Sequence, residues 1–300
     1  MPKTFILIRC VEFNQRIEEM IALFQASLPS WTVVAVPDCT GLDEERTAQR
    51  LAEFSVPALG ITDTFITESG LHHAHSGART GWLCGDYVFY RALELQWDYA
   101  WLVEPDLYFL NGAEDILRRL QKLEHDLIAT HLWPSGPQWM WGEALLNSVP
   151  DIKPYAMAFP FCRLSRELVK ESLSLRKKIA DGYPGTGRLP NDEVVVASTA
   201  YDCGFSMLDV QSLYEEAFRF WGTITRVSIE DVQDSFDIPL IVHSGQKRDR
   251  LDPYLDRYLK GALEGSELYQ SQLLKSLRTA SKETILQFVS RALETYGSKK

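Results

Sequence analysis

Short apolar runs alternate with segments of helical periodicity in the first part of the chain, and this alternation limits the possible folds most. The runs at 5–8 and 32–36 are almost wholly apolar, which is typical of strands buried on both faces. Apolar residues recur at helical spacing across 13–28, and a second helix-like segment covers 42–54. A strand–helix–strand–helix order predicts parallel strands joined by right-handed crossovers. We therefore expect an α/β fold, Rossmann-like, whose mostly parallel central sheet carries helices on both faces.

Composition narrows the class of protein. The chain has 300 residues, of which 45% are hydrophobic and 24% charged, as in ordinary globular proteins. Its formal net charge of -10 argues against a nucleic-acid partner, because binding to a phosphate backbone needs clustered Lys and Arg. Five scattered cysteines without metal-binding spacing indicate a reducing compartment. With no signal-peptide pattern and no apolar run of membrane-spanning length, a cytoplasmic location is predicted.

Two carboxylates follow the apolar run 98–103, in the sequence Glu104-Pro105-Asp106. Residues two apart in an extended backbone point to the same side, so both carboxylates would be presented together. Proline cannot donate to a sheet ladder, so Pro105 marks where the strand leaves the sheet. Ligands of parallel sheets bind at the carboxyl ends of the strands, and paired carboxylates suit a hard divalent cation. The alternative is a loop with two solvated acids.

A late strand is predicted over 238–242, and His243, Gly245 and Lys247 come directly after it. Imidazole nitrogen is an acceptable third metal ligand beside two carboxylates. Gly245 would let the backbone approach a phosphate, and Lys247 would supply a positive charge to it. A single histidine at a strand end can also be purely structural.

A long loop is predicted over 60–82, because four glycines interrupt any periodicity there. It contains His72, His73 and His75, which match neither the HExxH helix nor a Cys/His knuckle, so a flexible loop near a ligand is favoured over a metal site. Arg79 could reach a phosphate with bidentate geometry. In the helix predicted over 83–95, Asp86 is either a helix-start charge or a ligand for a hydroxyl group.

Two further segments allow both a structural and a functional interpretation. Asn191-Asp192-Glu193 has the pattern of a helix start, yet acids at that position can also hold a substrate hydroxyl or act as a base. The loop 131–141 contains three tryptophans, which either stack on the acceptor or cap the core.

The order of these elements resembles the nucleotide-sugar glycosyltransferases of the GT-A fold. In that family an Asp-x-Asp motif and a late histidine bind a divalent metal that holds the donor diphosphate. The His243-x-Gly245-x-Lys247 sequence is similar to the closing motif of glycogenin-like and lipopolysaccharide galactosyltransferases. Glu104-Pro105-Asp106 departs from Asp-x-Asp, and a similar departure is found in fungal mannosyltransferases. The resemblance covers roughly residues 4 to 250.

The resemblance implies a role for each candidate residue. The donor would be a nucleotide-diphosphate sugar, the acceptor a glycan or other hydroxyl compound, and the cofactor Mn²⁺ or Mg²⁺. The metal ligands would be Glu104, Asp106 and His243, and the phosphate would be contacted by Lys247 and Arg79. Arg9 and Asp38 would contact the nucleotide base and the ribose. Asp192 or Glu193 would contact the donor sugar or act as the general base, and Asp86 would be a weaker donor contact.

The chain is predicted to divide into a catalytic domain (1–250) and a C-terminal helical extension (251–300) with helices at 266–277 and 281–296. The second helix aligns apolar residues that would pack on the catalytic domain or on a second subunit in a homodimer, and peripheral membrane contact is the alternative. These residues are Ile285, Leu286, Val289 and Leu293.

The predicted function is a metal-dependent glycosyltransferase of polysaccharide biosynthesis. A non-catalytic sugar-nucleotide or glycan-binding protein on the same scaffold is the alternative. A nucleotidyltransferase is the third choice, disfavoured because no Gly-rich, basic phosphate loop follows the first strand.

Overall fold

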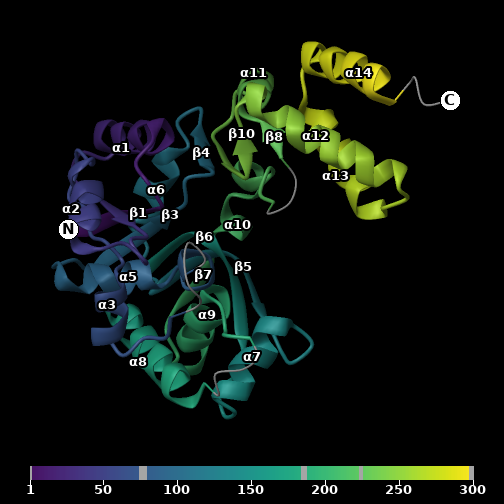
Figure 1. Cartoon of the computed structure of the whole chain (residues 1–300). Helices are drawn as coiled ribbons and strands as arrows, with labels where there is room; N and C mark the ends of the chain where they lie inside the picture. The colour runs from purple at the N-terminus through teal and green to yellow at the C-terminus, as the bar shows by residue number, and fades with distance from the viewer. Residues whose placement is uncertain (1, 74–79, 184–187, 223–225, 297–300) are drawn as a thin grey trace. The chain divides into compact units, whose positions relative to one another are not determined.

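Two compact units make up the chain in the computed structural model, which describes residues 2–73, 80–183, 188–222 and 226–296 (Figure 1). Unit 1 comprises Met1–Pro105 and Arg118–Leu213. Unit 2 comprises Asp106–Leu117 and Tyr214–Lys300. Each unit is therefore built from two separate stretches of chain, and the first stretch of unit 2 begins at the second acid of Glu104-Pro105-Asp106. The functional boundary expected near residue 250 stays a prediction.

The core of unit 1 is a six-stranded sheet in the order β2-β1-β3-β6-β5-β7. Its β1–β2, β1–β3 and β5–β7 pairs are parallel, whereas β6 pairs antiparallel with both β3 and β5. The mostly parallel sheet is thus confirmed, with one reversed strand that the sequence did not predict. The strands are β1 (Thr4–Cys10), β2 (Thr32–Pro37), β3 (Tyr99–Val103), β5 (Leu127–Pro134), β6 (Tyr155–Ser165) and β7 (Met207–Asp209).

Both faces of this sheet are covered. Successive residues of a strand point to opposite faces, and almost every residue of β1, β3 and β6 is buried. Figure 1 shows α1 on one side of the sheet and α5, α8 and α9 on the other. The helices of unit 1 are α1 (Gln15–Ser27), α2 (Glu44–Ala52), α3 (Asp63–Glu68), α4 (Thr80–Leu83), α5 (Tyr87–Arg91), α7 (Met140–Ser148), α8 (Arg166–Gly182), α9 (Asp192–Asp202) and α10 (Val210–Leu213), with the 3-10 turn η1 (Ala92–Glu94).

Helix α3 lies inside the segment that was predicted to be a loop. Its start is fixed by Thr62, whose hydroxyl accepts a hydrogen bond from the backbone N–H of Phe65. Gly70 then adopts a left-handed backbone with φ of 66°, which ends the helical segment after two turns. The helix is too short for a periodic pattern to reveal it.

Unit 2 contains two small two-stranded sheets and the C-terminal helices. In one sheet β4 (Leu107–Leu110) pairs antiparallel with β9 (Leu240–His243), and in the other β8 (Val227–Ser228) pairs parallel with β10 (Gly245–Gln246). Helix α6 (Glu114–Leu120) spans the change from unit 2 back to unit 1. The other elements are η2 (Glu215–Phe218), α11 (Ile229–Ser235), α12 (Arg248–Leu263), α13 (Glu267–Thr279) and α14 (Lys282–Tyr296).

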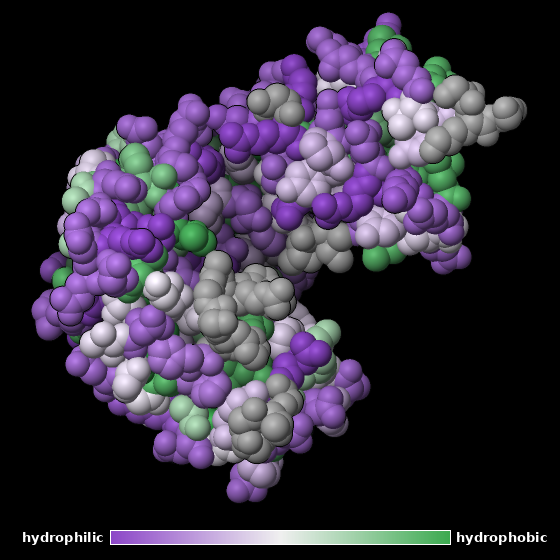
Figure 2. Space-filling model, viewed as in Figure 1, coloured by the Kyte–Doolittle hydropathy of each residue, from purple (hydrophilic) through white to green (hydrophobic). Residues whose placement is uncertain are grey.

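The predicted C-terminal helices are confirmed, but within the chain α14 packs through another face than its predicted apolar stripe. Its buried residues are Thr284 and Phe288, and Phe288 joins a cluster with Leu251, Leu255 and Tyr258 of α12. Three residues of the predicted apolar stripe, Leu286, Val289 and Leu293, are 59%, 44% and 65% exposed, whereas Ile285 is half-buried. Most of the stripe therefore does not pack on the chain, and its contact with a second subunit or with a membrane stays a prediction. Figure 2 shows such hydrophobic residues at the surface of the C-terminal helices. Within the described ranges, no helix has the length and apolar character needed to cross a membrane.

Candidate metal and donor site

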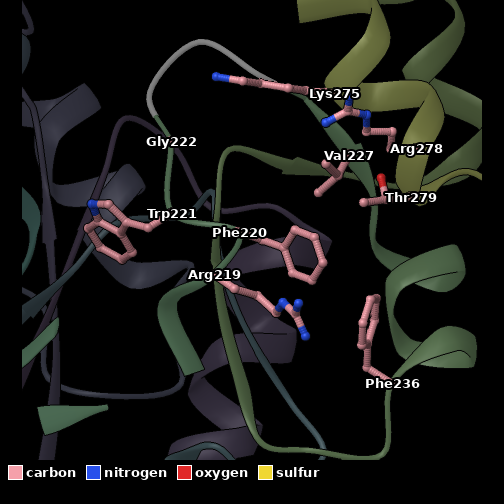
Figure 3. Close-up of a pocket in the computed structure, with 9 residues that line it drawn as sticks. All are labelled: Arg219, Phe220, Trp221, Gly222, Val227, Phe236, Lys275, Arg278 and Thr279. Atoms are coloured by element: carbon pink, nitrogen blue, oxygen red, sulfur yellow. The ribbon is translucent and has the colours of Figure 1, made fainter. Parts of the chain in front are cut away.

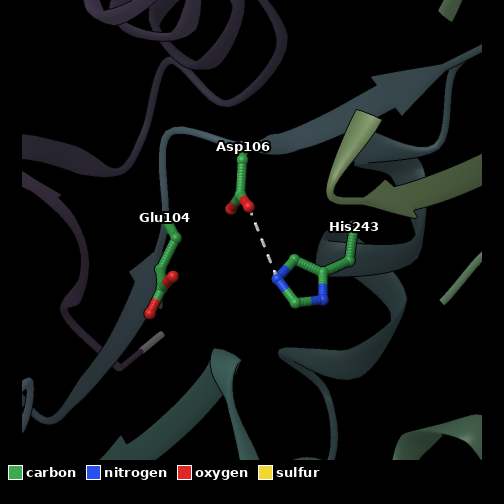
Figure 4. Close-up of side chains that lie close together, drawn as sticks. All are labelled: Glu104, Asp106 and His243. Carbon is green, nitrogen blue, oxygen red and sulfur yellow. Dashed lines mark ion pairs between the residues drawn. The ribbon is translucent and has the colours of Figure 1, made fainter. Parts of the chain in front are cut away.

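The pairing of β4 with β9 brings Asp106 and His243 together. Leu107, the first residue of β4, lies opposite His243, the last residue of β9. The backbone N–H of Ser244 donates to the carbonyl oxygen of Asp106 at 3.0 Å, which extends this ladder by one step. As a result, His243 Nε2 lies 3.6 Å from Asp106 Oδ2, as Figure 4 shows. Two residues far apart in the sequence thus form an oxygen–nitrogen pair within unit 2.

The environment of this pair suits a divalent cation. Asp106 Oδ1 and His243 Nδ1 are both buried and have no hydrogen-bond partner in the part of the chain that the structure describes. Burial lowers the pKa of His243; the carboxylate of Asp106 opposes this shift and the guanidinium of Arg226 adds to it. The imidazole is therefore neutral near pH 7, as a metal ligand must be. Carboxylate oxygen and imidazole nitrogen together suit Mn²⁺ and leave Mg²⁺ possible.

The turn after β9 explains the sequence His243-Ser244-Gly245. Ser244 has a φ of 65°, in the left-handed backbone region that residues other than Gly, Asn and Asp seldom adopt. A Cβ on Gly245 would come within 2.2 Å of Ile229 Cδ1 and 3.0 Å of a Tyr108 ring carbon. The glycine is thus needed for packing in unit 2, a reason different from the approach to phosphate expected from the sequence.

Arg226 is a site residue that sequence reasoning missed. Its Nη1 atom lies 3.5 Å from Asp106 Oδ2, and its guanidinium lies over the ring of Tyr254 at 5.3 Å. It stands directly before the two-residue strand β8 and belongs to no motif, so no pattern pointed to it. Lys247 is half-buried at the start of α12 and provides a second positive charge in the same unit.

Glu104 belongs to a second cluster, in unit 1. Its Oε1 atom lies 2.6 Å from Arg9 Nη2, and Arg9 Nη1 lies 3.6 Å from Asp192 Oδ2. Arg9 is near the end of β1, Glu104 directly follows β3, and Asp192 begins α9. The predicted base and ribose contact is thus an arginine between two carboxylates. This cluster is continuous with Asp106 along the chain through Pro105, in the turn between β3 and β4.

Gly85 is essential to this cluster. A Cβ at this position would lie 2.0 Å from Arg9 Nη1 and 2.4 Å from Asp192 Oδ2, so any side chain would displace the ion pair. We expect Gly85→Ala to lower the free energy of unfolding by about 1–3 kcal/mol, as overpacking of a filled site does. Urea denaturation measures this. Gly222→Ala is the control, because a Cβ there meets no atom within 4 Å, and an equal loss in both variants would contradict the prediction.

Asp192 and Glu193 occupy the helix start predicted for them. Asn191 caps α9 by accepting from the N–H of Val194, and Asp192 is 4% exposed. Asp192 Oδ2 accepts from the backbone N–H of Gly85 at 2.9 Å. Burial raises the pKa of Asp192 well above its usual value, opposed by Arg9, and burial also raises the pKa of Glu193. A carboxylate with a raised pKa is suited to accept a proton near neutral pH.

The raised pKa of Asp192 predicts how stability depends on pH. A carboxyl group whose pKa is higher in the folded state than in the unfolded state stabilises the fold at low pH. This contribution is complete below the unfolded pKa, about 3.9, and is lost as pH rises through the folded pKa. The free energy of unfolding of the wild type relative to Asp192→Asn should therefore fall as pH rises from about 4. Urea denaturation across pH tests this. Asp202→Asn, exposed at the other end of α9, should show no such trend. A difference that grows with pH would mean that attraction to Arg9 dominates.

Asp86 has structural partners in the interior of unit 1. It is fully buried, and its two carboxylate oxygens accept from Arg176 Nε at 2.5 Å and Nη2 at 2.8 Å. The hydroxyl of Tyr90 also donates to it, at 2.7 Å. Arg176 is buried too and donates through Nη1 to the carbonyl of Pro190, two residues before Asp192. This bidentate ion pair accounts for an acid at position 86, and its expected contact with the donor stays a prediction.

The other predicted contacts are less informative. Asp38 follows β2 and accepts from the backbone N–H and hydroxyl of Thr40, at 3.0 and 2.7 Å. Arg79 and His75 lie outside the described residues. The ring of His73 has partners at both nitrogens, Asp63 at 3.3 Å and Thr67 at 3.2 Å.

The three tryptophans of the loop 131–141 do not form one surface. Trp141 is 9% exposed in the core, with the guanidinium of Arg188 over its ring at 4.8 Å. Trp133 is 39% exposed, and its ring centroid lies 5.6 Å from that of Trp139. Part of the motif thus caps the core, and an acceptor platform at Trp133 and Trp139 stays a prediction.

Comparison with known proteins gives similarity at the level of solved structures. No protein-family model matches the chain. No curated protein matches it either. The chain is similar to an active-site mutant of the galactosyltransferase LgtC, at 9% identity and a TM-score of 0.40, over 75% of this chain and 76% of that chain.

The chain is also similar to solved structures of two other enzymes. Glucosyl-3-phosphoglycerate synthase from Mycobacterium tuberculosis, in complex with Mn²⁺, uridine-diphosphate and phosphoglyceric acid, is 13% identical with a TM-score of 0.34. The match covers 57% of this chain and only 58% of the synthase chain. The inositol-1-phosphate CTP transferase from T. maritima is 9% identical with a TM-score of 0.36, over 70% of this chain and 86% of that chain. The TM-scores of these three matches all lie below 0.5, so the function of this chain rests on its own residues.

Proposed function

We propose that this protein is a metal-dependent glycosyltransferase that moves a sugar from a nucleotide-diphosphate sugar to a glycan or other hydroxyl acceptor. The observation that carries the proposal is the Asp106–His243 pair, 3.6 Å apart, with Arg226 beside it. An acid and a neutral imidazole hold a divalent cation, and adjacent positive charges stabilise phosphate oxygens.

The proposed metal ligands are Glu104, Asp106 and His243. Glu104 is two residues from Asp106 in the chain, so the covalent backbone keeps both acids within reach of one cation. Because Glu104 Oε1 pairs with Arg9, Glu104 would coordinate through its other oxygen or after release from Arg9. The Mn²⁺ or Mg²⁺ ion would neutralise the leaving diphosphate.

The remaining residues have distinct proposed roles. Arg226 and Lys247 would contact phosphate oxygens, as would Arg79, while Arg9 and Asp38 would flank the base and ribose. Asp192 or Glu193 would contact the donor sugar or take the proton of the acceptor hydroxyl, which the raised pKa values support. Arg9 would also keep Asp192 and Glu104 in place, since it contacts both.

A thermal-shift panel tests the proposal. Nucleoside diphosphates and nucleotide sugars are added with and without Mn²⁺. A ligand that binds only the folded protein stabilises it by RT ln(1 + [L]/Kd), about 2.7 kcal/mol at a hundredfold excess over Kd. We expect stabilisation by one nucleotide sugar that requires the metal, followed by transfer to an acceptor. No shift with any nucleotide would refute the proposal.

One observation favours a second function. Glu104 forms an ion pair with Arg9, although a catalytic metal would need its carboxylate as a ligand. This arrangement suits a protein that binds a sugar nucleotide without turning it over. Single-turnover assays distinguish the two, because metal-dependent binding without any transfer or hydrolysis would identify the binding protein. Pyrophosphate release from a nucleoside triphosphate and a sugar phosphate would instead indicate a nucleotidyltransferase.

A further inference from the structure

A cavity of about 510 Å³ lies within unit 2, between the segment 219–222 and helix α13. Its volume is in the range of small-molecule sites. Figure 3 shows Phe220 and Arg219 facing Phe236 and α13 across the cavity. The lining residues that matter here are Arg219, Phe220, Trp221, Phe236, Lys275 and Arg278. We refer to it as the α13 pocket.

One wall of the α13 pocket is aromatic. The rings of Phe220 and Phe236 meet edge to face, with centroids 5.2 Å apart. The guanidinium of Arg219 lies 4.9 Å from the Phe236 ring and 5.7 Å from the Phe220 ring. Cation–π contacts with two rings hold this charge at the edge of an apolar surface. The wall can therefore receive an apolar group and an anion next to each other.

The opposite wall carries two more positive charges. Lys275 and Arg278 are three residues apart on α13, so they share one face of the helix. Neither forms an ion pair with any residue in the described ranges, whereas Arg219 pairs with the exposed Glu216 at 3.3 Å. No acid is among the described residues that line the pocket. Three cations around one cavity suit a phosphate, which Arg and Lys bind through charge-assisted hydrogen bonds.

The α13 pocket shares its walls with the Asp106–His243 site. Figure 3 shows Trp221 on the opposite side of its segment from Phe220, and its ring centroid lies 5.0 Å from that of His243. On the other wall, the hydroxyl of Ser276 in α13 donates to the carbonyl of Arg226 at 2.6 Å. Arg226 in turn contacts Asp106. A molecule held in the pocket would thus be adjacent to the proposed metal ligands of the same unit.

We infer that the α13 pocket binds the phosphate group of the acceptor, so that the acceptor is a phosphate-bearing hydroxyl compound with an apolar portion that lies on Phe220 and Phe236. This inference rests on the proposed glycosyltransferase function and specifies its acceptor class. The phosphate could belong to a soluble phosphate ester or to a lipid headgroup, since both present the same dianion to the three cations.

The test compares two double variants of the full chain. Lys275→Gln with Arg278→Gln removes two charges from the pocket. Lys260→Gln with Lys282→Gln removes the same charge from exposed positions of α12 and α14 that do not line it. Hexyl phosphate and a short-chain phosphatidic acid, a soluble ester and a lipid that each carry an apolar portion, are titrated while tryptophan fluorescence is recorded, because Trp221 lines the pocket. We expect the pocket variant to lose at least about tenfold in affinity and the control to bind like the wild type.

Each outcome of this test is informative. Stronger binding of hexyl phosphate indicates a soluble phosphate ester, and stronger binding of the lipid indicates a headgroup; both support the inference. Equal affinity in the two variants, or no binding by the wild type, would overturn it. Competition between the probes and a nucleoside diphosphate with Mn²⁺ would also overturn it, because the pocket would then belong to the donor. Donor binding is measured in the pocket variant as well. If the donor still binds but the phosphate probes do not bind as expected, this inference fails while the proposed function stands.

Discussion

Asp106→Asn is expected to abolish metal-dependent donor binding and sugar transfer while leaving the fold intact. The substitution removes the negative charge beside His243 and Arg226 but keeps nearly the same shape. Loss of a residue that only supports a metal ligand costs 10–100-fold in affinity or activity, so loss of a ligand itself should cost at least about 100-fold. Titration of Mn²⁺ in the presence of a nucleoside diphosphate measures the affinity, and product formation measures the activity.

Asp237→Asn is the matched control for this prediction. Asp237 is exposed in unit 2 and lies between α11 and β9, so the same chemical change there should leave both readouts unchanged. Denaturation curves establish whether each variant is folded. A folded Asp106→Asn variant with wild-type turnover would show that Asp106 does not hold the metal.

Asp86→Asn is expected to cause a large loss of stability in unit 1. It would leave the guanidinium of Arg176 buried without its carboxylate, and breaking a buried ion pair in this way costs about 3–5 kcal/mol. Adding Arg176→Met removes the stranded charge, so the double variant should recover most of the loss. Urea denaturation of the two single variants and the double variant gives the coupling free energy.

Glu167→Gln provides the comparison with an exposed ion pair. Glu167 and Lys170 are 2.6 Å apart, but their side chains are 69% and 49% exposed, so the expected loss is below about 1 kcal/mol. Similar losses at positions 86 and 167 would contradict the proposed burial effect.

The double variant Asp86→Asn with Arg176→Met also tests the donor role predicted for Asp86. If it folds but no longer binds the nucleotide sugar, Asp86 contacts the donor; if binding persists, the residue is structural.

The sequence revealed the fold well wherever periodicity extends over enough residues. The apolar runs of β1, β2 and β3 and the helical spacing of α1 lie where they were predicted. The direction of β6 could not be predicted, because a strand buried on both faces has the same continuous apolar pattern whether it runs parallel or antiparallel to its neighbours. Short elements such as α3 and β8 carry too few residues for any period.

The site was predictable only where residue type itself carries the chemistry. Asp106 and His243 are of residue types that commonly bind metals and lie next to strand ends, and the structure places them together. Arg226 escaped notice because an arginine before a short strand has many ordinary uses. The partner of Asp86 escaped as well, since Arg176 lies in the middle of a helix and only the packing of α8 near α5 brings the two charges together. Contacts of this kind depend on tertiary structure and leave no local pattern.

The pairing of β4 with β9 has a consequence for how the chain is made. During synthesis Leu107–Leu110 leaves the ribosome long before Leu240–His243, whereas nearly all of unit 1 is complete once Leu213 has emerged. Domains generally fold as units during synthesis, so unit 1 can form while β4 remains an unpaired strand edge. A later step would then join β4 to β9 and bring His243 to Asp106. A nascent chain released before residue 240 would lack the Asp106–His243 pair and expose an edge that promotes aggregation, so this pair would form only in chains synthesised past residue 243.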